Sequence, residues 1–171
     1  MSTILTQTLS ANTAITFDIS SLGTSSTFVA GRESTQVDNT STNYIDAIVN
    51  VDTILGHAST APTIGQQIQL YAWGADTSLA TTAIDVLDGT DSAETLSHVS
   101  ILNSLKFVAA PTVTVATAGL AYFIPPFSVA SLFGGNMPKF WGLYLAHNHT
   151  GALAASQSAL FSFNGVTYTA A

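Results

Sequence analysis

The sequence contains no cysteine and very few ionised side chains. Without cysteine, the 171-residue chain can form no disulfide, no thiolate metal site and no thiol nucleophile. The absence of cysteine does not indicate whether the protein works in a reducing or an oxidising compartment. Lys, Arg, Asp and Glu make up 8% of the residues, whereas about 25% is typical. Because 47% of the residues are hydrophobic, the chain can bury a core and is not disordered. We therefore expect other chains to cover part of its uncharged surface.

Basic residues are especially scarce. Arg32, Lys106 and Lys139 stand against ten acidic residues, so the formal net charge is −7. Phosphate contacts need clustered Lys and Arg, and we therefore predict no nucleic-acid partner and no binding to anionic membranes. Long apolar runs are missing too, since Lys106 and three prolines interrupt the most apolar tract, residues 105–133. The first residues lack the basic and apolar regions of a signal peptide, so no export signal is expected.

Alternation of apolar and polar residues dominates what is present. In NYIDAIVNVDTI, residues 43–54, apolar side chains fall on one side and Asp or Asn on the other, which predicts a strand with one buried face. QIQLYAW, residues 67–73, alternates in the same way and places Tyr71 and Trp73 on its more polar side. Asn164-Gly165, between two strand-like runs, predicts a tight hairpin because both turn residues need positive φ.

Turn residues separate these strands at short intervals and predict an all-β fold. We expect an antiparallel β-sandwich, jelly-roll-like, of about eight strands with at most one or two short helices. The helix candidates are SAETLSHVSILNSL, residues 92–105, with Ser92 as its cap, and FSVASLFGG, residues 127–135, ending at glycine. Residues 13–171 form the single sandwich domain, and residues 1–12 are assigned to an N-terminal arm.

The stretch FWGLYLAHNHTGALAAS, residues 140–156, raises the question of metal or nuclease chemistry. Both alternating faces of FWGLYLAH are largely apolar, which predicts a central strand or one whose outer face is covered. If that strand continued, His147 and His149 would share a face and reach one metal ion, with a three-fold axis supplying further ligands. Otherwise His147 ends the strand and His149 lies in a turn. We favour the second interpretation and predict no metal and no cofactor.

No other motif indicates catalysis. The acidic residues of DVLDGTDSAE, residues 85–94, recur every three positions, whereas a calcium loop places its ligands at alternate positions. The only glutamates are Glu33 and Glu94, and nothing in the sequence holds a carboxyl pair in a cleft as glycoside hydrolysis requires. Serine-hydrolase, phosphate-loop, zinc-protease and dinucleotide patterns are missing. We therefore predict that the protein is not an enzyme.

Several residues are candidates for contacts with other chains. Arg32 suits either an intrachain pair with an aspartate or a contact across subunits, since its planar fork matches carboxylates. Trp73 is the better tryptophan for a contact surface because it faces the polar side of its strand. MSTILTQTL, residues 1–9, is interpreted as an arm that pairs with a neighbour's sheet edge. The full set of interface candidates is Ile4, Leu5, Arg32, Glu33, Tyr71, Trp73 and Lys139.

Three stretches resemble a group of small virion proteins of tailed bacteriophages. These are AGRESTQVDNTSTNYIDAIV, VLDGTDSAETL and FSVASLFGGNMPKFWGLYLAHNHTGALAAS, about half of the chain, and they consist of turns, strand ends and a covered strand. The resemblance extends to capsid cement or decoration proteins, several of which are β-sandwich trimers. It implies a protein that clamps the outer capsid lattice, and it carries over no binding residues.

We therefore expect a homotrimeric capsid cement protein, located on the virion surface and bound to the major capsid protein or another virion protein. Uncharged β surface buried against neighbouring subunits, repeated over many copies, would supply the affinity. The alternative is a tail- or fibre-associated module that binds a receptor or carbohydrate through Trp73 or Tyr71. A bacterial surface adhesin domain is a third hypothesis. Deleting residues 1–9 should weaken assembly but leave the domain folded.

Overall fold

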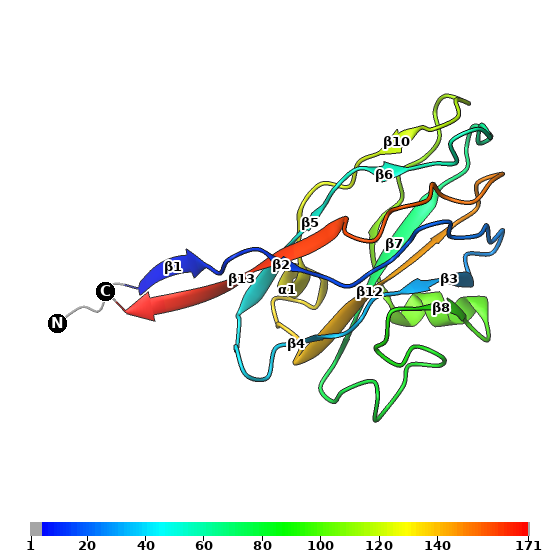
Figure 1. Cartoon of the computed structure of the whole chain (residues 1–171). Coiled ribbons are helices and arrows are strands. Elements are labelled where there is room, and N and C mark those ends of the chain that lie inside the picture. Colours follow the sequence, from blue (N-terminus) through cyan, green and yellow to red (C-terminus); the bar gives the residue numbers. More distant parts are fainter. Residues whose placement is uncertain (1–4, 171) are drawn as a thin grey trace.

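The computed structural model describes residues 5–170, and its regular secondary structure is mostly β (Figure 1). Every pair of strands is antiparallel, and eight strands have four residues or more, so the predicted all-β antiparallel architecture is confirmed. The jelly-roll connectivity stays a prediction. The strands are β1 (Leu5–Leu9), β2 (Thr13–Ala14), β3 (Ala30–Glu33), β4 (Val37–Asp38), β5 (Asp46–Val51), β6 (Ile54–Leu55), β7 (Ile68–Ala75), β8 (Ser92–Thr95), β9 (Lys106–Ala109), β10 (Ala121–Tyr122), β11 (Phe127–Ser128), β12 (Phe140–His147) and β13 (Phe161–Ala170).

Two larger sheets and one strand pair contain these strands. The first sheet has the order β1-β13-β5-β11, with β2 also paired to β13. The second sheet has the order β8-β3-β12-β7-β9, with β4 also paired to β12. Strands β6 and β10 pair only with each other. The longest pairing joins β12 and β7 over eight residues, so β12 is the central strand that its two apolar faces predicted.

The main core joins the first sheet to the second. Alternation brings Val49 of β5 and Phe163 of β13 into it from one sheet and Trp141 and Leu143 of β12 from the other, all of them buried. The rings of Trp141 and Phe163 meet edge to face, with centroids 5.3 Å apart. Burial of large side chains from facing sheets is the main stabilising contribution to such a sandwich.

A second core covers the opposite face of the second sheet. Tyr71 and Trp73 of β7 and Tyr144 of β12 lie there with four buried leucines from the segments that follow β7, Leu79, Leu87, Leu96 and Leu105. Trp73 is only 1% exposed and Tyr71 is 8% exposed. The prediction that these two side chains form a contact surface is therefore wrong. Alternation located their face correctly, but residues 76–105 cover that face with a further layer.

The Asn164-Gly165 pair does not form a turn, so the predicted hairpin is wrong. Both residues lie inside β13, where Gly165 pairs with Ala47 of β5. A Cβ atom on Gly165 would lie 2.5 Å from ring atoms of Tyr44. Glycine is therefore needed here because the Tyr44 ring packs directly on the backbone, and not because the chain turns.

The two helix predictions have different outcomes. Ser92–Thr95 is strand β8, which pairs with β3, and the helical segment after it is only a 3₁₀-helix, η1 (Val99–Ser104), capped by His98. Ser92 is therefore not a helix cap. The second prediction is confirmed: α1 (Val129–Leu132) begins after Ser128, whose side chain accepts the N–H of Ser131.

Candidate interaction surfaces

Arg32 makes an intrachain ion pair. Its Nε donates to Oδ1 of Asp91 at 2.7 Å, and its Nη2 donates to the carbonyl of Asp91 at 3.1 Å. The same carboxylate accepts the backbone N–H of Asp18. Of the two roles considered for Arg32, the structure shows the intrachain pair, and this pair ties β3 to the residue that precedes β8.

Glu33 lies inside the protein and offers no surface to a partner, so its interpretation as an interface residue is wrong. The side chain is 0% exposed, and its two oxygens accept the backbone N–H groups of Asp88 and Gly89, each at 3.0 Å. Burial raises the pKa of Glu33 to about 8, while the two N–H donors partly offset that rise. Glu33 thus holds the 85–91 loop against β3.

The remaining interface candidates lie at the surface or outside the described residues. Lys139 is exposed just before β12, and Leu5 is exposed at the start of β1. Ile4 lies outside the described residues. The predicted arm is paired within its own chain: residues Leu5–Leu9 run antiparallel to the C-terminal part of β13.

His147 and His149 are both buried, with ring centroids 5.1 Å apart. Nε2 of His147 donates to the carbonyl of Leu22 at 2.8 Å, and its Nδ1 accepts the backbone N–H of His149 at 3.2 Å. Both ring nitrogens are thereby used, and the hydrogen bonds define one neutral tautomer. Such a ring has no lone pair free for a metal, in agreement with the strand-end interpretation.

The ring of His149 has a different environment. It lies against the Tyr122 ring, with centroids 4.9 Å apart, and its Nε2 is buried without a hydrogen-bond partner. Burial, followed by the neighbouring His147, lowers the pKa of His149 to about 4, and burial also lowers the pKa of His147. Among the described residues, no group of three or more His, Asp or Glu side chains could hold a metal ion.

Acid should destabilise the protein through these two histidines. Their folded-state pKa values lie below the ordinary value of about 6.5, so the unfolded chain takes up protons first as pH falls. The histidine contribution to stability is complete above about pH 6.5 and is lost as pH falls towards 4. We expect His149 alone to remove about 3 kcal/mol over that range, from about 1.4 kcal/mol per pH unit.

Urea unfolding between pH 7 and pH 4 measures this effect. His149→Gln should reduce the loss of stability on acidification, whereas His98→Asn, at an exposed histidine, should leave it unchanged. An equal loss in His149→Gln and in the wild type would contradict the assignment.

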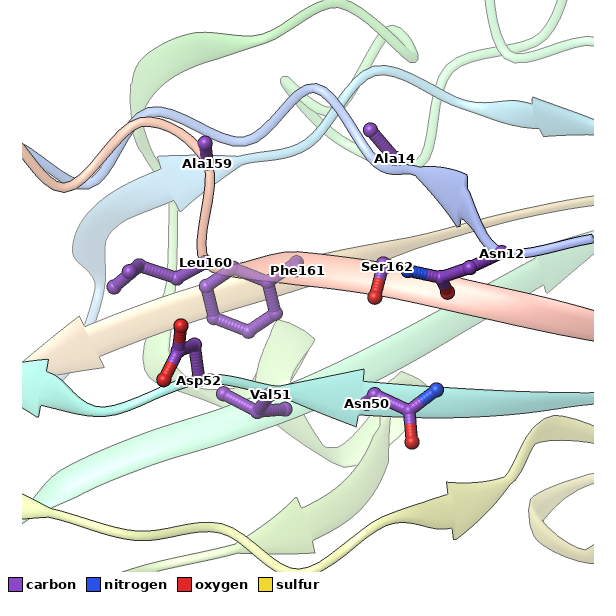
Figure 2. Close-up of a pocket in the computed structure, with 9 residues that line it drawn as sticks. All are labelled: Asn12, Ala14, Asn50, Val51, Asp52, Ala159, Leu160, Phe161 and Ser162. Atoms are coloured by element: carbon purple, nitrogen blue, oxygen red, sulfur yellow. The ribbon is translucent and has the colours of Figure 1, made fainter.

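A polar groove crosses the outer face of the first sheet (Figure 2). Its volume is about 560 Å³, and Ala14, Ser162 and Asn50 are cross-strand neighbours along it. The lining residues are Asn12, Ala14, Asn50, Val51, Asp52, Ala159, Leu160, Phe161 and Ser162. Asp52 is the only charged residue among them. The groove therefore offers amides and a hydroxyl for hydrogen bonding and no pair of carboxyls for acid–base chemistry.

Two ends of the molecule contain no Asp, Glu, Lys or Arg side chain. One is the ribbon, which we define as β1 and residues 166–170 of β13, and which projects beyond the other strands of the first sheet (Figure 1). The other is the loop end, defined as residues 55–66 and 112–123 around β6 and β10. All thirteen charged residues lie between positions 18 and 52, between 76 and 106, or at 139. The ribbon and the loop end are thus the two surfaces at which the low charge of the sequence becomes a complete absence of Asp, Glu, Lys and Arg.

Both surfaces expose large apolar side chains that the sequence interpretation mostly missed. The ribbon exposes Leu5, Leu9 and Tyr168, and the loop end exposes Ile64, Val115 and Phe123, the last of them 72% exposed. The alternation in LTQTL and VTYT, residues 5–9 and 166–169, was a usable signal for the ribbon. No comparable pattern marks the loop end, since its apolar residues are scattered along two irregular loops.

Within residues 5–170, no helix is long and apolar enough to cross a membrane. Comparisons with protein-family models, curated proteins and solved structures found no match to this chain.

Proposed function

We propose that this protein is a non-enzymatic structural protein of a bacteriophage virion, a capsid cement protein that bridges neighbouring subunits on the head surface. The observation that carries the proposal is that, among the described residues, seven of the eleven exposed large apolar side chains lie at two ends that contain no Asp, Glu, Lys or Arg. The thirteen charged side chains, with a net charge of −7, all lie outside the ribbon and the loop end, which are partly apolar. Interface cores are depleted in charged residues in the same way.

The loop end is built as a preformed contact surface. Gly65 donates its N–H to the carbonyl of Val113 at 2.9 Å, and Gly119 donates to the carbonyl of His57 at 2.8 Å. These bonds join the two loops, so little conformational freedom is lost when they bind. Exposed Ile64, Val115 and Phe123 would each contribute about 1.5–3 kcal/mol if fully buried. Many copies on a lattice multiply such modest contacts.

Phe123→Asp should release the protein from the head. The carboxylate would be desolvated against a capsid subunit, so we expect a loss of occupancy of tenfold or more, about 1.4 kcal/mol, on purified particles. Val99→Asp is the matched control, because Val99 is also exposed but lies on η1, away from the loop end. Quantitative mass spectrometry of the particles measures occupancy, with hundreds of wild-type copies expected. A few dozen copies or fewer, or full occupancy by Phe123→Asp, would contradict the proposal.

The polar groove favours one second candidate, a receptor- or carbohydrate-binding module of the tail. Buried Tyr71 and Trp73 cannot stack on a sugar, so recognition would rest on Asn12, Asn50 and Ser162 in the groove. Its hydrogen-bonding groups suit a neutral polar ligand. A copy number typical of a tail, together with binding that Asn50→Ala removes in a glycan screen, would establish this function instead of the first.

A further inference from the structure

The ribbon has one apolar face and one face of threonines. In the register Leu5↔Ala170 to Leu9↔Val166, directly opposite residues share a face. Leu5, Gln7 and Leu9 therefore lie on the same face as Tyr168, while Thr6, Thr8, Thr167 and Thr169 form the other. Leu5 is 62% exposed, Leu9 60% and Tyr168 55%. This alternation is typical of a strand pair with one covered face, yet in the described residues that face is buried only at Val166, at the base of the ribbon.

Both edges of the ribbon are open as well. β13 pairs with β5 only as far as Val166↔Asp46, so one edge of residues 167–170 has no partner strand among residues 5–170. The outer edge of β1 also has none within that range. An isolated two-stranded ribbon is marginally stable in water, and exposed edges are templates for pairing with another chain.

The base of the ribbon is held firmly, so the direction in which it projects is determined by the domain. Ser10 donates its N–H to the carbonyl of Gly165, and its side-chain oxygen accepts the N–H of Gly165, both at 2.8 Å. Asn164 donates from its side chain to the carbonyl of Ser10 at 3.0 Å. At the midpoint of the ribbon, the hydroxyls of Thr8 and Thr167 are 2.8 Å apart.

We infer that the ribbon is the trimerisation element of this protein, and that three ribbons close into a six-stranded antiparallel barrel. The inference rests on the proposed function and deepens it, because it identifies the contact through which copies of the cement protein would join. The two open edges of a ribbon differ, so β1 of one copy pairs with β13 of the next, and this head-to-tail contact, repeated in three copies, forms a closed ring. Strand directions then alternate around the ring, and no edge is left open.

The barrel also covers the exposed faces. The Leu5, Leu9 and Tyr168 side chains of three copies point inward and fill the narrow interior of a small barrel, while the threonines point outward to water. Gln7 and Tyr168 lie in one layer, where their polar groups can pair around the axis. A dimer joined through its two β1 edges would leave the β13 edges open. Three chains can approach one another at the ribbon despite a charge of −7 each, because residues 1–17 and 140–171 contain no Asp, Glu, Lys or Arg.

Native mass spectrometry and sedimentation of the full chain at about 10 µM test the inference. The wild type should have three times the chain mass of 17.7 kDa. Leu9→Asp should reduce the mass to that of one chain, because it places a carboxylate on the inward face. Thr6→Asp is the matched control on the same strand but on the outward face, and it should stay trimeric. Circular dichroism should show the same folded sandwich in both variants.

Either of two results would overturn the inference: a monomeric or dimeric wild type, or a Leu9→Asp variant that stays trimeric. Particle binding is measured separately, so the two proposals fail in different ways. A trimer that does not bind capsids would contradict only the cement function, and a monomer that binds them would contradict only the barrel.

Discussion

Gly142→Ala should lower the free energy of unfolding by about 3 kcal/mol, at the upper end of the usual cost of overpacking a core. Gly142 lies at the centre of the second sheet, directly opposite Trp73 on β7. A Cβ atom there would lie 2.7 Å from Cε2 of the indole and closer still to Cζ2. Trp73 is enclosed by the second core, so its ring cannot move aside without displacing Tyr144 or the leucines around it.

Thermal and urea unfolding measure this effect. A loss of about 3 kcal/mol corresponds to a Tm lower by about 10 °C for a domain of this size. Gly23→Ala is the control, because nothing lies within 4 Å of a Cβ at Gly23, and it should be neutral or slightly stabilising. Trp73→Leu combined with Gly142→Ala should cost less than the sum of the single changes, since the smaller side chain frees the space. Equal stabilities of Gly142→Ala and Gly23→Ala would contradict the packing argument.

Raising the pH from about 4.5 to about 8 should destabilise the protein through Glu33. In the folded state the pKa of this carboxyl is about 8, chiefly because burial disfavours the charged form. The unfolded chain releases the proton near pH 4.5, whereas the folded chain retains it. The Glu33 contribution is therefore complete below pH 4.5 and is lost as pH rises through 8, by an amount on the order of 4 kcal/mol.

Comparison with Glu33→Gln isolates this contribution from the histidines, which act with the opposite sign below pH 6.5. The glutamine cannot ionise, but its amide nitrogen cannot accept one of the N–H groups of Asp88 and Gly89. We expect the variant to be less stable than the wild type at pH 5 by about 1–3 kcal/mol, and the gap to shrink as pH rises. Glu94→Gln is the control and should keep the wild-type slope. A gap in Glu33→Gln that is constant with pH would contradict the burial argument.

The strands with one buried face were predictable from the sequence. The alternation in residues 43–54 and 67–73 depends only on the two-residue period of a strand. β5 lies within the first stretch, and β7 begins in the second and continues two residues beyond it. The two apolar faces of residues 140–147 likewise predicted a central strand, which β12 is. FSVASLFGG predicted α1 because the glycines that follow a helix end are a local signal, whereas its cap, Ser128, was identified only in the structure.

Residues whose role depends on a distant partner could not be predicted in this way. Gly165 is a glycine because the Tyr44 ring lies on it, not because the chain turns there. Glu33 is buried because the backbone of residues 88–89 supplies donors for its oxygens. Trp73 faces the polar side of its strand, and only the layer formed by residues 76–105 makes that side a core.

The sequence by itself determined that this protein is an all-β chain with a core and with too few charges to cover its surface. Periodicity and composition can be read along the chain without any knowledge of tertiary contacts. The tertiary structure decided where that uncharged surface lies, at the ribbon and at the loop end. Residues 5–9 and 166–170 have alternation that any strand could have. Only their pairing with each other, beyond the end of the sandwich, leaves one apolar face and two edges open.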